Sequence, residues 1–472
     1  LIAVQRCFLT FSKGRKCQYE CWNGMSLLWK QYTNKSSKKH IYLVCQYCIL
    51  NVYFKASSKT GEFDWDAKQQ GVILGSFYYG YILTMLPGGY VAERYSSKLV
   101  ILFASLGATI CTMLSPIVAL EGGVGALIGL KIIQGLLQGP IIPAVMALIS
   151  SWIPQEERSF GTAIIWGGQR LGAVACFALS GFLAEELGWE WDFYFFGILG
   201  GVFCILWTIF ISSSPISHPS ISQKECDYIM NAMQSNKVGR AVPPPPPYKQ
   251  IAKSIPFWAL AVTSICQSWG FYTLQTNVPT YLNNIQHIPL TMNGIVSALP
   301  FLLNWLASIP IGLMADWLIS SGTLKRGTTR KLMTSIGMGG PAIALLCLTF
   351  VGCDSELAIT ILCFALLTLG AALSGYMVNQ LELSPNYAGT LKGATSTIAN
   401  VCGFATPAIV GALTFGEQTL DAWNNVFIVS AALYFIGGLT FVLFGDTSIQ
   451  SWNTYWVIND SNDETVPLLI SQ

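Results

Sequence analysis

The chain has 472 residues, of which 52% are hydrophobic and only 11% charged, and its formal net charge is +2. Soluble domains carry about 25% charged residues, so this composition excludes an ordinary soluble protein, and the small net charge gives no reason to expect nucleic acid as a partner. Apolar runs long enough to cross a bilayer core of roughly 30 Å recur along the chain. We therefore predict an all-α polytopic membrane protein embedded in a lipid bilayer.

Eleven spans are predicted, each an apolar run between charged or Pro/Gly-rich breaks. In chain order they cover residues 69–91, 98–119, 124–150, 160–184, 191–211, 256–280, 292–316, 331–352, 356–380, 390–414 and 424–445. The interval before the sixth span contains the run Pro243 to Pro247, which favours a stiff linker. The predicted parts are an atypical amino-terminal segment (1–60), a first helical bundle (61–211), a Pro-rich cytosolic linker (212–255), a second helical bundle (256–446) and a cytosolic tail (447–472).

Five predicted spans precede the linker and six follow it, so a fold of two six-helix bundles requires a twelfth span before residue 69. The best candidate is the apolar stretch 41–54, which as a helix would be about 21 Å long. That length is short for a crossing. We expect the first helix to be incomplete or missing, because the amino-terminal segment is incomplete or mis-spliced.

Charged loops alternate in sign along the chain. Loops such as 182–192 and 352–357 contain acids but no Lys or Arg, whereas the alternate loops around Arg94 and Arg330 are basic. Cytosolic loops of membrane proteins are enriched in Lys and Arg. We predict that the basic loops are cytosolic and that the acidic loops face the outside or a lumen.

Two of the basic loops share a pattern. The segments GGYVAERYSSK (88–98) and IGLMADWLISSGTLKRGTTRK (311–331) both read Gly-x-x-Ala-acid followed by a basic cluster. Two parallel repeats of this kind are typical of the major facilitator fold. We predict a cytosolic conformational latch between helices that is formed by Glu93, Arg94, Lys98, Asp316, Arg330 and Lys331.

Two cations lie inside predicted spans. Stranding a charge in hydrocarbon costs several kcal/mol, so Lys131 and Arg170 are candidate functional residues. An arginine offers a fork that matches a carboxylate or phosphate, and a lysine offers a point charge. We predict that both bind a small anionic substrate. The alternatives are a Lys131 that snorkels to the interface and an Arg170 that forms a structural salt bridge or cap.

Polar residues continue from Lys131 along one helix face. Gln134 and Gln138 follow it at helical spacing, and Gly135 and Gly139 suit close helix packing. We predict that this face lines the substrate cavity, although Gln138 would also serve as a helix–helix hydrogen bond.

Three further residues are candidates for substrate binding. Gln275 and Asn277 lie on a span interrupted by Gly270 and Pro279, where freed backbone groups can line a cavity. The tyrosine-rich stretch 78–81 is expected to contribute one hydroxyl to the cavity, assigned to Tyr79.

The tail contains the segment NDETVPLL (462–469). Glu464 with Leu468 and Leu469 resembles an acidic dileucine sorting signal, and the alternative is a disordered tail. The 14 cysteines are scattered and show no metal-ligand spacing, so no metal site is expected.

Several stretches resemble one transporter family. They include FDWDAKQQGVILGSFYYGYILTMLPGGYVAER (63–94), SSWIPQEERSFGTA (150–163) and ELSPNYAGTLKG (382–393). They are similar to the anion/cation symporter family of the major facilitator superfamily, which includes sialin, the vesicular glutamate transporters and the sodium-dependent inorganic phosphate cotransporters. The resemblance runs from about 61 to 446, does not include 1–60, and is closest to the sialin-like and phosphate-type members.

The resemblance also carries implications for individual residues. The family's fourth helix reads Arg-x-x-x-Gly-x-x-Glu-Gly, which aligns Lys131 with the arginine and Gln138 with a glutamate implied in proton coupling. Gln138 cannot titrate, so proton coupling is in doubt here. Glutamate carriers place an arginine at Gln267 and a histidine at Leu74, which weighs against glutamate as the substrate. The positive charge that those carriers have at the position of Gln267 is absent here. Arg170 supplies one at a position where family members have a neutral residue.

The expected function is secondary active transport of small anions, either inorganic phosphate or small organic anions, by alternating access. An ion gradient would drive it, with sodium or membrane potential favoured over protons, and no cofactor other than a co-transported ion is expected. The alternatives are a sialin-like lysosomal proton-coupled exporter of acidic sugars and a non-transporting paralogue or receptor. No span holds a catalytic motif, so we expect no enzyme. The expected location is the plasma membrane or a lysosomal or endosomal membrane.

Overall fold

A computed structural model describes residues 67–154, 157–216, 218–234, 245–278, 281–282, 285–286, 290–352, 354–413, 419–453, 455–459 and 464–468. The candidate twelfth span at 41–54, Pro279 and Leu469 lie outside these residues. Long apolar helices dominate the described part, as the composition predicts.

The helices before the linker, which we call the first half, follow the predicted spans. They are α4 (Ala67–Val91), α5 (Ser97–Glu121), α6 (Gly123–Gln138), α7 (Ile141–Trp152), α8 (Arg158–Glu186) and α9 (Trp189–Phe210). A π-helical turn, η1 (Ala92–Ser96), connects α4 to α5, and the Ser96 hydroxyl caps α5 by accepting a hydrogen bond from the Leu99 amide. Pro140 separates α6 from α7, because proline cannot donate the helical hydrogen bond.

The helices after the linker, which we call the second half, also follow the predicted spans. They are α12 (Ile255–Tyr272), α14 (Leu290–Ser320), α15 (Arg326–Leu348), α16 (Ser355–Leu369), α17 (Ala371–Ser374), α18 (Tyr376–Leu383), α19 (Ala388–Ala399), α20 (Cys402–Leu413) and α21 (Leu420–Phe444). Two short turns extend them, η3 (Thr273–Asn277) and η4 (Pro385–Tyr387). The linker contains α10 (Gln223–Gln234) and α11 (Tyr248–Lys253).

The described helices suit a bilayer. Eight segments of the described residues are long and apolar enough to span one, and Gly75–Glu121 combines two predicted spans in a continuous run. Large apolar side chains such as Leu83, Phe103, Ile343 and Phe435 are exposed on the outside of the helices. Soluble proteins rarely expose extensive apolar surface, so these side chains are placed to face lipid.

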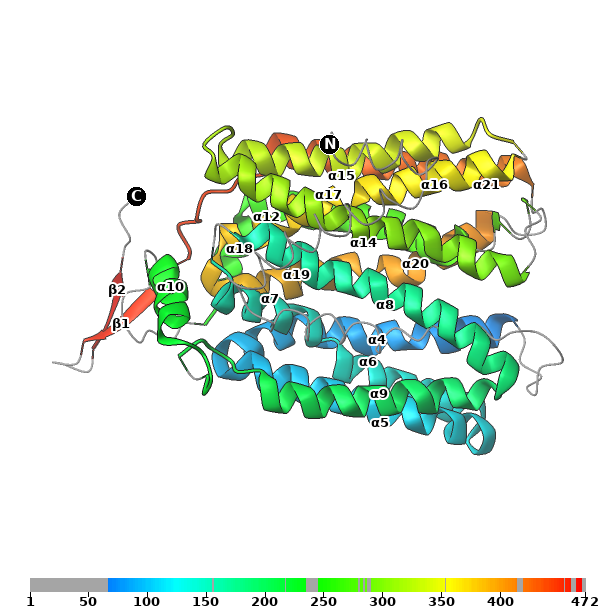
Figure 1. Ribbon diagram of the computed structural model, residues 1–472, viewed down its shortest axis with the longest axis horizontal. Helices are drawn as coiled ribbons and strands as arrows, with labels where there is room; N and C mark the ends of the chain where they lie inside the picture. The colour runs from blue at the N-terminus through cyan, green and yellow to red at the C-terminus, as the bar shows by residue number, and fades with distance from the viewer. Residues whose placement is uncertain are drawn as a thin grey trace, which may run out of the picture. The chain divides into compact units, whose positions relative to one another are not determined.

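Helices from the two halves lie against each other. Within the halves, α4 packs on α6, and α21 packs on both α12 and α15. Between the halves, α8 runs along α14, and α19 runs along α4 and α7 (Figure 1). The side chains of α8 therefore meet the second half, which matters for Arg170.

The tail contains a small sheet that the all-α prediction missed. Strand β1 (Tyr455–Asn459) pairs antiparallel with β2 (Glu464–Leu468), with Tyr455 opposite Leu468. The all-α prediction is confirmed for the membrane-spanning part, and this short sheet in the tail was not predicted. The reason is that a five-residue strand gives too short a pattern to detect from sequence.

Candidate functional site

Arg170 reaches from α8 of the first half to aromatic residues of the second half. Its side chain is only 7% exposed, and the guanidinium carbon lies 3.8 Å from the ring centroid of Phe271 on α12. The guanidinium also interacts electrostatically with the hydroxyl groups of Tyr272, Tyr376 and Tyr434. Arg170 therefore lies where the two halves meet.

The aromatic residues come from three helices and are held in place by packing and hydrogen bonds. The Tyr376 hydroxyl donates to the Gln267 side-chain oxygen at 3.1 Å, and the Tyr272 hydroxyl donates to Asn400 at 2.7 Å. Gly270 lets Tyr434 approach, because a Cβ atom at this position would lie 2.0 Å from its ring. The sequence of α12 thus determines how close α21 can come to Arg170.

Arg170 and one tyrosine have hydrogen-bonding capacity that the described residues do not use. The Nε atom of Arg170 and the hydroxyl of Tyr434 are buried without a hydrogen-bond partner among the described residues. Both ion pairs found in that part of the chain involve Glu382, and neither includes Arg170. A buried, unpaired guanidinium is costly, and it is suited to a carboxylate or phosphate ligand.

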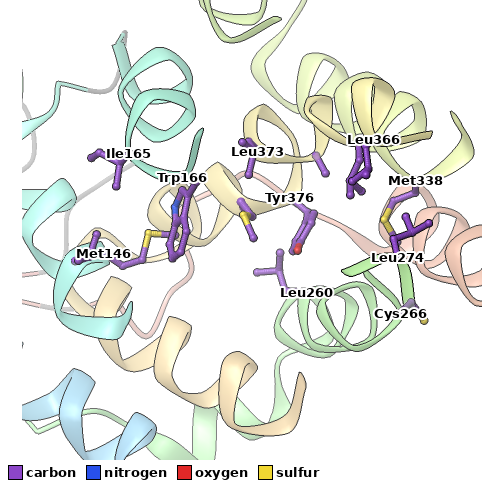
Figure 2. Close-up of a cluster of buried hydrophobic side chains, with 14 of the residues drawn as sticks. Met146, Ile165, Trp166, Leu260, Cys266, Leu274, Met338, Leu366, Leu373 and Tyr376 are labelled. Atoms are coloured by element: carbon purple, nitrogen blue, oxygen red, sulfur yellow. The ribbon is translucent and has the colours of Figure 1, made fainter. Parts of the chain in front are cut away.

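Arg170 also lies near the position where the family resemblance implies a different cation. Glutamate carriers have an arginine at the position of Gln267, and here Gln267 accepts a hydrogen bond from Tyr376, one of the residues around Arg170. Figure 2 shows Tyr376 in the same buried cluster as Trp166, which lies one helical turn before Arg170 on α8. The positive charge is thus supplied to this region from the first half rather than from α12.

Lys131 has different surroundings. Its ammonium donates to Gln134 at 3.0 Å, and the Gln134 amide donates in turn to Thr112 of α5 at 3.0 Å. The ammonium also lies 5.7 Å from the ring centroid of Phe193 on α9. These contacts all lie within the first half, and no contact found in the described residues joins Lys131 to Arg170. The role of Lys131 and Gln134 in substrate binding stays a prediction.

The rest of the predicted polar stripe is buried against α4. Gln138 is 4% exposed, and its amide nitrogen has no hydrogen-bond partner among the described residues. A Cβ atom at Gly135 would lie 2.0 Å from the Phe77 carbonyl oxygen. The predicted close packing at this glycine is therefore confirmed, and it is α4 that approaches.

The remaining predicted substrate contacts are spread over α4 and η3. Tyr79 is 53% exposed, and its ring lies 5.8 Å from that of Phe404 on α20. Gln275 and Asn277 are half-buried in the π-helical turn η3, a type of turn often found at functional sites. The described contacts do not bring these three side chains to Arg170, and their role stays a prediction.

One buried cation was not predicted as a site residue. Lys392 of α19 is 6% exposed, and its ammonium lies 5.5 Å from the ring centroid of Trp166 on α8. The sequence offered one signal, an ionisable residue just inside the predicted span 390–414. A lysine so near the end of a span usually reaches the interface, so the sequence alone does not indicate that this one is buried.

The two repeated acids make matching contacts between the halves. Glu93 accepts hydrogen bonds from the amide and hydroxyl of Thr390 at 2.8 and 2.6 Å, near the start of α19. Asp316 accepts from the amides of Ser159 and Phe160 at 3.2 and 2.8 Å, at the start of α8. Each carboxylate thus binds free N–H groups at the amino terminus of a helix in the other half, where negative charge is favourable.

The basic residues predicted beside these acids behave differently from one another. Arg330 is fully buried, pairs with Glu382 at 2.6 Å, and donates to the Ser159 hydroxyl at 2.6 Å across the halves. Lys98 donates to the Thr208 carbonyl within the first half. Arg94 is exposed and Lys331 half-buried. A latch role for the set stays a prediction.

Comparisons with known proteins agree with this arrangement. The sequence profile described as Major Facilitator Superfamily matches residues 43–410. The expectation that residues 1–60 fall outside the family is therefore wrong for 43–60, whose short apolar run was too weak a signal. In structure, the chain is similar to the proton:xylose symporter XylE, with a TM-score of 0.64 and 15% identity over 86% of this chain and 94% of that one.

Relatives with higher sequence identity include sialin and proteins named for the transport of phosphate or glutamate. Sialin of Homo sapiens is 39% identical over 396 residues, covering 84% of this chain and 79% of sialin. A protein of Drosophila ananassae named "Putative inorganic phosphate cotransporter" is 38% identical over 419 residues, covering 88% of this chain and 85% of that protein. Vesicular glutamate transporter 3 of Danio rerio is 32% identical over 405 residues, covering 84% and 67% respectively. The chain belongs to the Major Facilitator Superfamily, within the group of relatives that contains these transporters.

Proposed function

We propose that this protein is a secondary active transporter of small anions, inorganic phosphate or a small organic anion, and that it works by alternating access. The observation that carries the proposal is Arg170, a buried cation at the contact between the halves with no carboxylate partner among the described residues. The names of the relatives, which include sialin and a phosphate cotransporter, support an anion as the substrate.

The mechanism follows from the position of Arg170 between the halves. The first half supplies the cation, and the second half supplies the tyrosine hydroxyls around it. An anion bound there contacts both halves at once, so it favours the state in which they close around it. The helix-end contacts of Glu93 and Asp316 join the halves at the predicted cytosolic end, and they must break before the anion can leave on that side.

The proposed driving force is a sodium gradient or the membrane potential. Proton coupling is less well supported because Gln138, at the position of the family's titratable glutamate, cannot exchange a proton. A positively charged site also makes potential-driven movement of an anion feasible, since each elementary charge moved across 100 mV corresponds to about 2.3 kcal/mol.

Uptake by reconstituted protein tests the proposal. The full-length protein is placed in liposomes, and entry of labelled phosphate or labelled small carboxylates is followed while sodium, pH and potential are varied separately. We expect saturable anion uptake that responds to sodium or to potential. Absence of uptake under every gradient, by folded protein, would contradict transport and favour the non-transporting alternative.

A lysosomal location is the second candidate, paired with export of acidic sugars. Glu464, Leu468 and Leu469 resemble a sorting signal, and the described part of this segment forms strand β2. Replacing both leucines by alanine should move a tagged protein from lysosomes to the cell surface. A wild-type protein that is found only at the cell surface would exclude this candidate.

A further inference from the structure

Lys392 is a buried lysine at the contact between the halves. Its helix, α19, packs on α4 and α7 of the first half. The side chain is 6% exposed, and its ammonium stands 5.5 Å from the indole centroid of Trp166 on α8. The lysine therefore reaches from the second half to the same helix that carries Arg170.

The described residues give Lys392 no acidic partner. The two ion pairs in that part of the chain join Glu382 to Arg326 and Arg330. An indole face attracts a cation, but this attraction is weaker than the hydration that a buried ammonium gives up. An anion beside Lys392 would supply the missing stabilisation.

Trp166 relates Lys392 to Arg170 in space. Trp166 and Arg170 lie four residues apart on α8, so they share one face and are separated by about 6 Å along the helix axis. Lys392 contacts the first of these residues, and the guanidinium of the second lies on Phe271. Arg170 thus projects from the same face of α8 that Lys392 of the second half contacts, and no ion pair found in the described residues includes either cation.

We propose that Lys392 is the second cationic group of the anion site and that the site selects small anions with two negative charges. Monohydrogen phosphate and short dicarboxylates belong to this class. Arg170 binds one carboxylate or phosphate oxygen and Lys392 binds the other carboxylate or a second phosphate oxygen. A dianion therefore neutralises a cation from each half, whereas a monoanion leaves one positive charge uncompensated. The inference rests on the proposed anion transport and adds the charge of the substrate.

Matched pairs of anions test the selectivity. Succinate and its monoamide have similar length but carry two charges and one, and monohydrogen phosphate and dimethyl phosphate form a second pair. Inhibition of labelled anion uptake by each compound is measured in proteoliposomes that contain full-length protein. We expect each dianion to inhibit at least about tenfold more strongly than its partner, since a charge-assisted contact has this size.

Three variants separate a binding role from a structural one. Lys392→Met removes the charge and should reduce the dianion preference about tenfold, to near equality. Lys392→Arg keeps the charge and should keep the preference. Lys224→Met removes an exposed lysine of α10 and should leave uptake and preference unchanged. Thermal stabilisation of purified protein by each anion repeats the comparison without requiring transport.

Several outcomes overturn the inference. A wild-type protein that transports monoanions as well as dianions contradicts it and leaves the proposed anion transport intact. A Lys392→Met variant that is slower but equally selective also contradicts it, and assigns Lys392 to the contact with Trp166 in the closed state. If the wild-type protein takes up no anion, the proposed function itself fails.

Discussion

Arg170 and Lys131 are both cations inside apolar helices, yet their surroundings differ. Lys131 has its ammonium bonded to Gln134, which bonds onward to Thr112, and all of these groups belong to the first half. Arg170 crosses to the second half, rests on an aromatic ring, and keeps a buried Nε atom without a partner among the described residues. The Lys131 ammonium is bound within its own half, which favours a role in the fold, whereas the buried Nε atom of Arg170 is available to a ligand.

The largest expected effect comes from Arg170. Replacing it by glutamine removes the charge but keeps a polar side chain, and we expect kcat/KM for anion uptake to fall about 100-fold, which corresponds to about 3 kcal/mol of lost interaction with the anion. Arg170→Lys keeps the charge but loses the forked guanidinium, so its kcat/KM should lie between those of the wild-type protein and Arg170→Gln. Initial rates in proteoliposomes measure both, and near-normal uptake by Arg170→Gln would remove Arg170 from the site.

A smaller effect is expected from Tyr434, whose hydroxyl has no described partner. Tyr434→Phe should leave thermal stability nearly unchanged and raise KM roughly tenfold, because one hydrogen bond to a charged group contributes about 1.5 kcal/mol. Tyr281→Phe is the matched control, since its buried hydroxyl accepts a hydrogen bond from Gln286 away from Arg170. Tyr281→Phe should lower the thermal stability without changing KM. If Tyr434→Phe lowers stability and leaves KM unchanged, the Tyr434 hydroxyl does not bind the anion.

The smallest effect on transport is expected from Lys131. Lys131→Met should change KM less than twofold but reduce stability by about 1 kcal/mol or more, since it leaves the Gln134 oxygen buried without its donor. The double variant with Gln134→Leu should recover part of that loss. Thermal unfolding in detergent and uptake kinetics separate the two effects. A large rise in the KM of Lys131→Met would show that Lys131 binds the substrate, as Arg170 is proposed to do.

The sequence was sufficient to predict the spanning helices and to identify some of the residues that join the two halves. Long apolar runs predicted each helix that carries the site, because burial of about 20 apolar residues is a strong local signal. The repeated acids Glu93 and Asp316 were identified from their shared spacing, and the structure gives both the same kind of partner. Arg170 was identified because a charge in a span is rare.

The partners of Arg170 could not be predicted. Tyr376 and Tyr434 lie more than 200 residues away in sequence, and aromatic residues are common in spans, so neither carries a local signal. Their meeting with Arg170 depends on how α8 packs against the second half. The partners of Lys131 could not be predicted either. Like Arg170 it is a cation inside a predicted span, but its hydrogen bond to Gln134 connects it to Thr112 of α5 in its own half.

The contacts of Asp316 have a consequence for how this protein tolerates change. The carboxylate binds the backbone amides of Ser159 and Phe160, and every residue except proline supplies such an amide. A library of substitutions at Phe160 should therefore retain this particular contact, while substitutions at Asp316 should not. Natural variation can accumulate at the positions that donate the amides as long as the accepting acid, Asp316, persists.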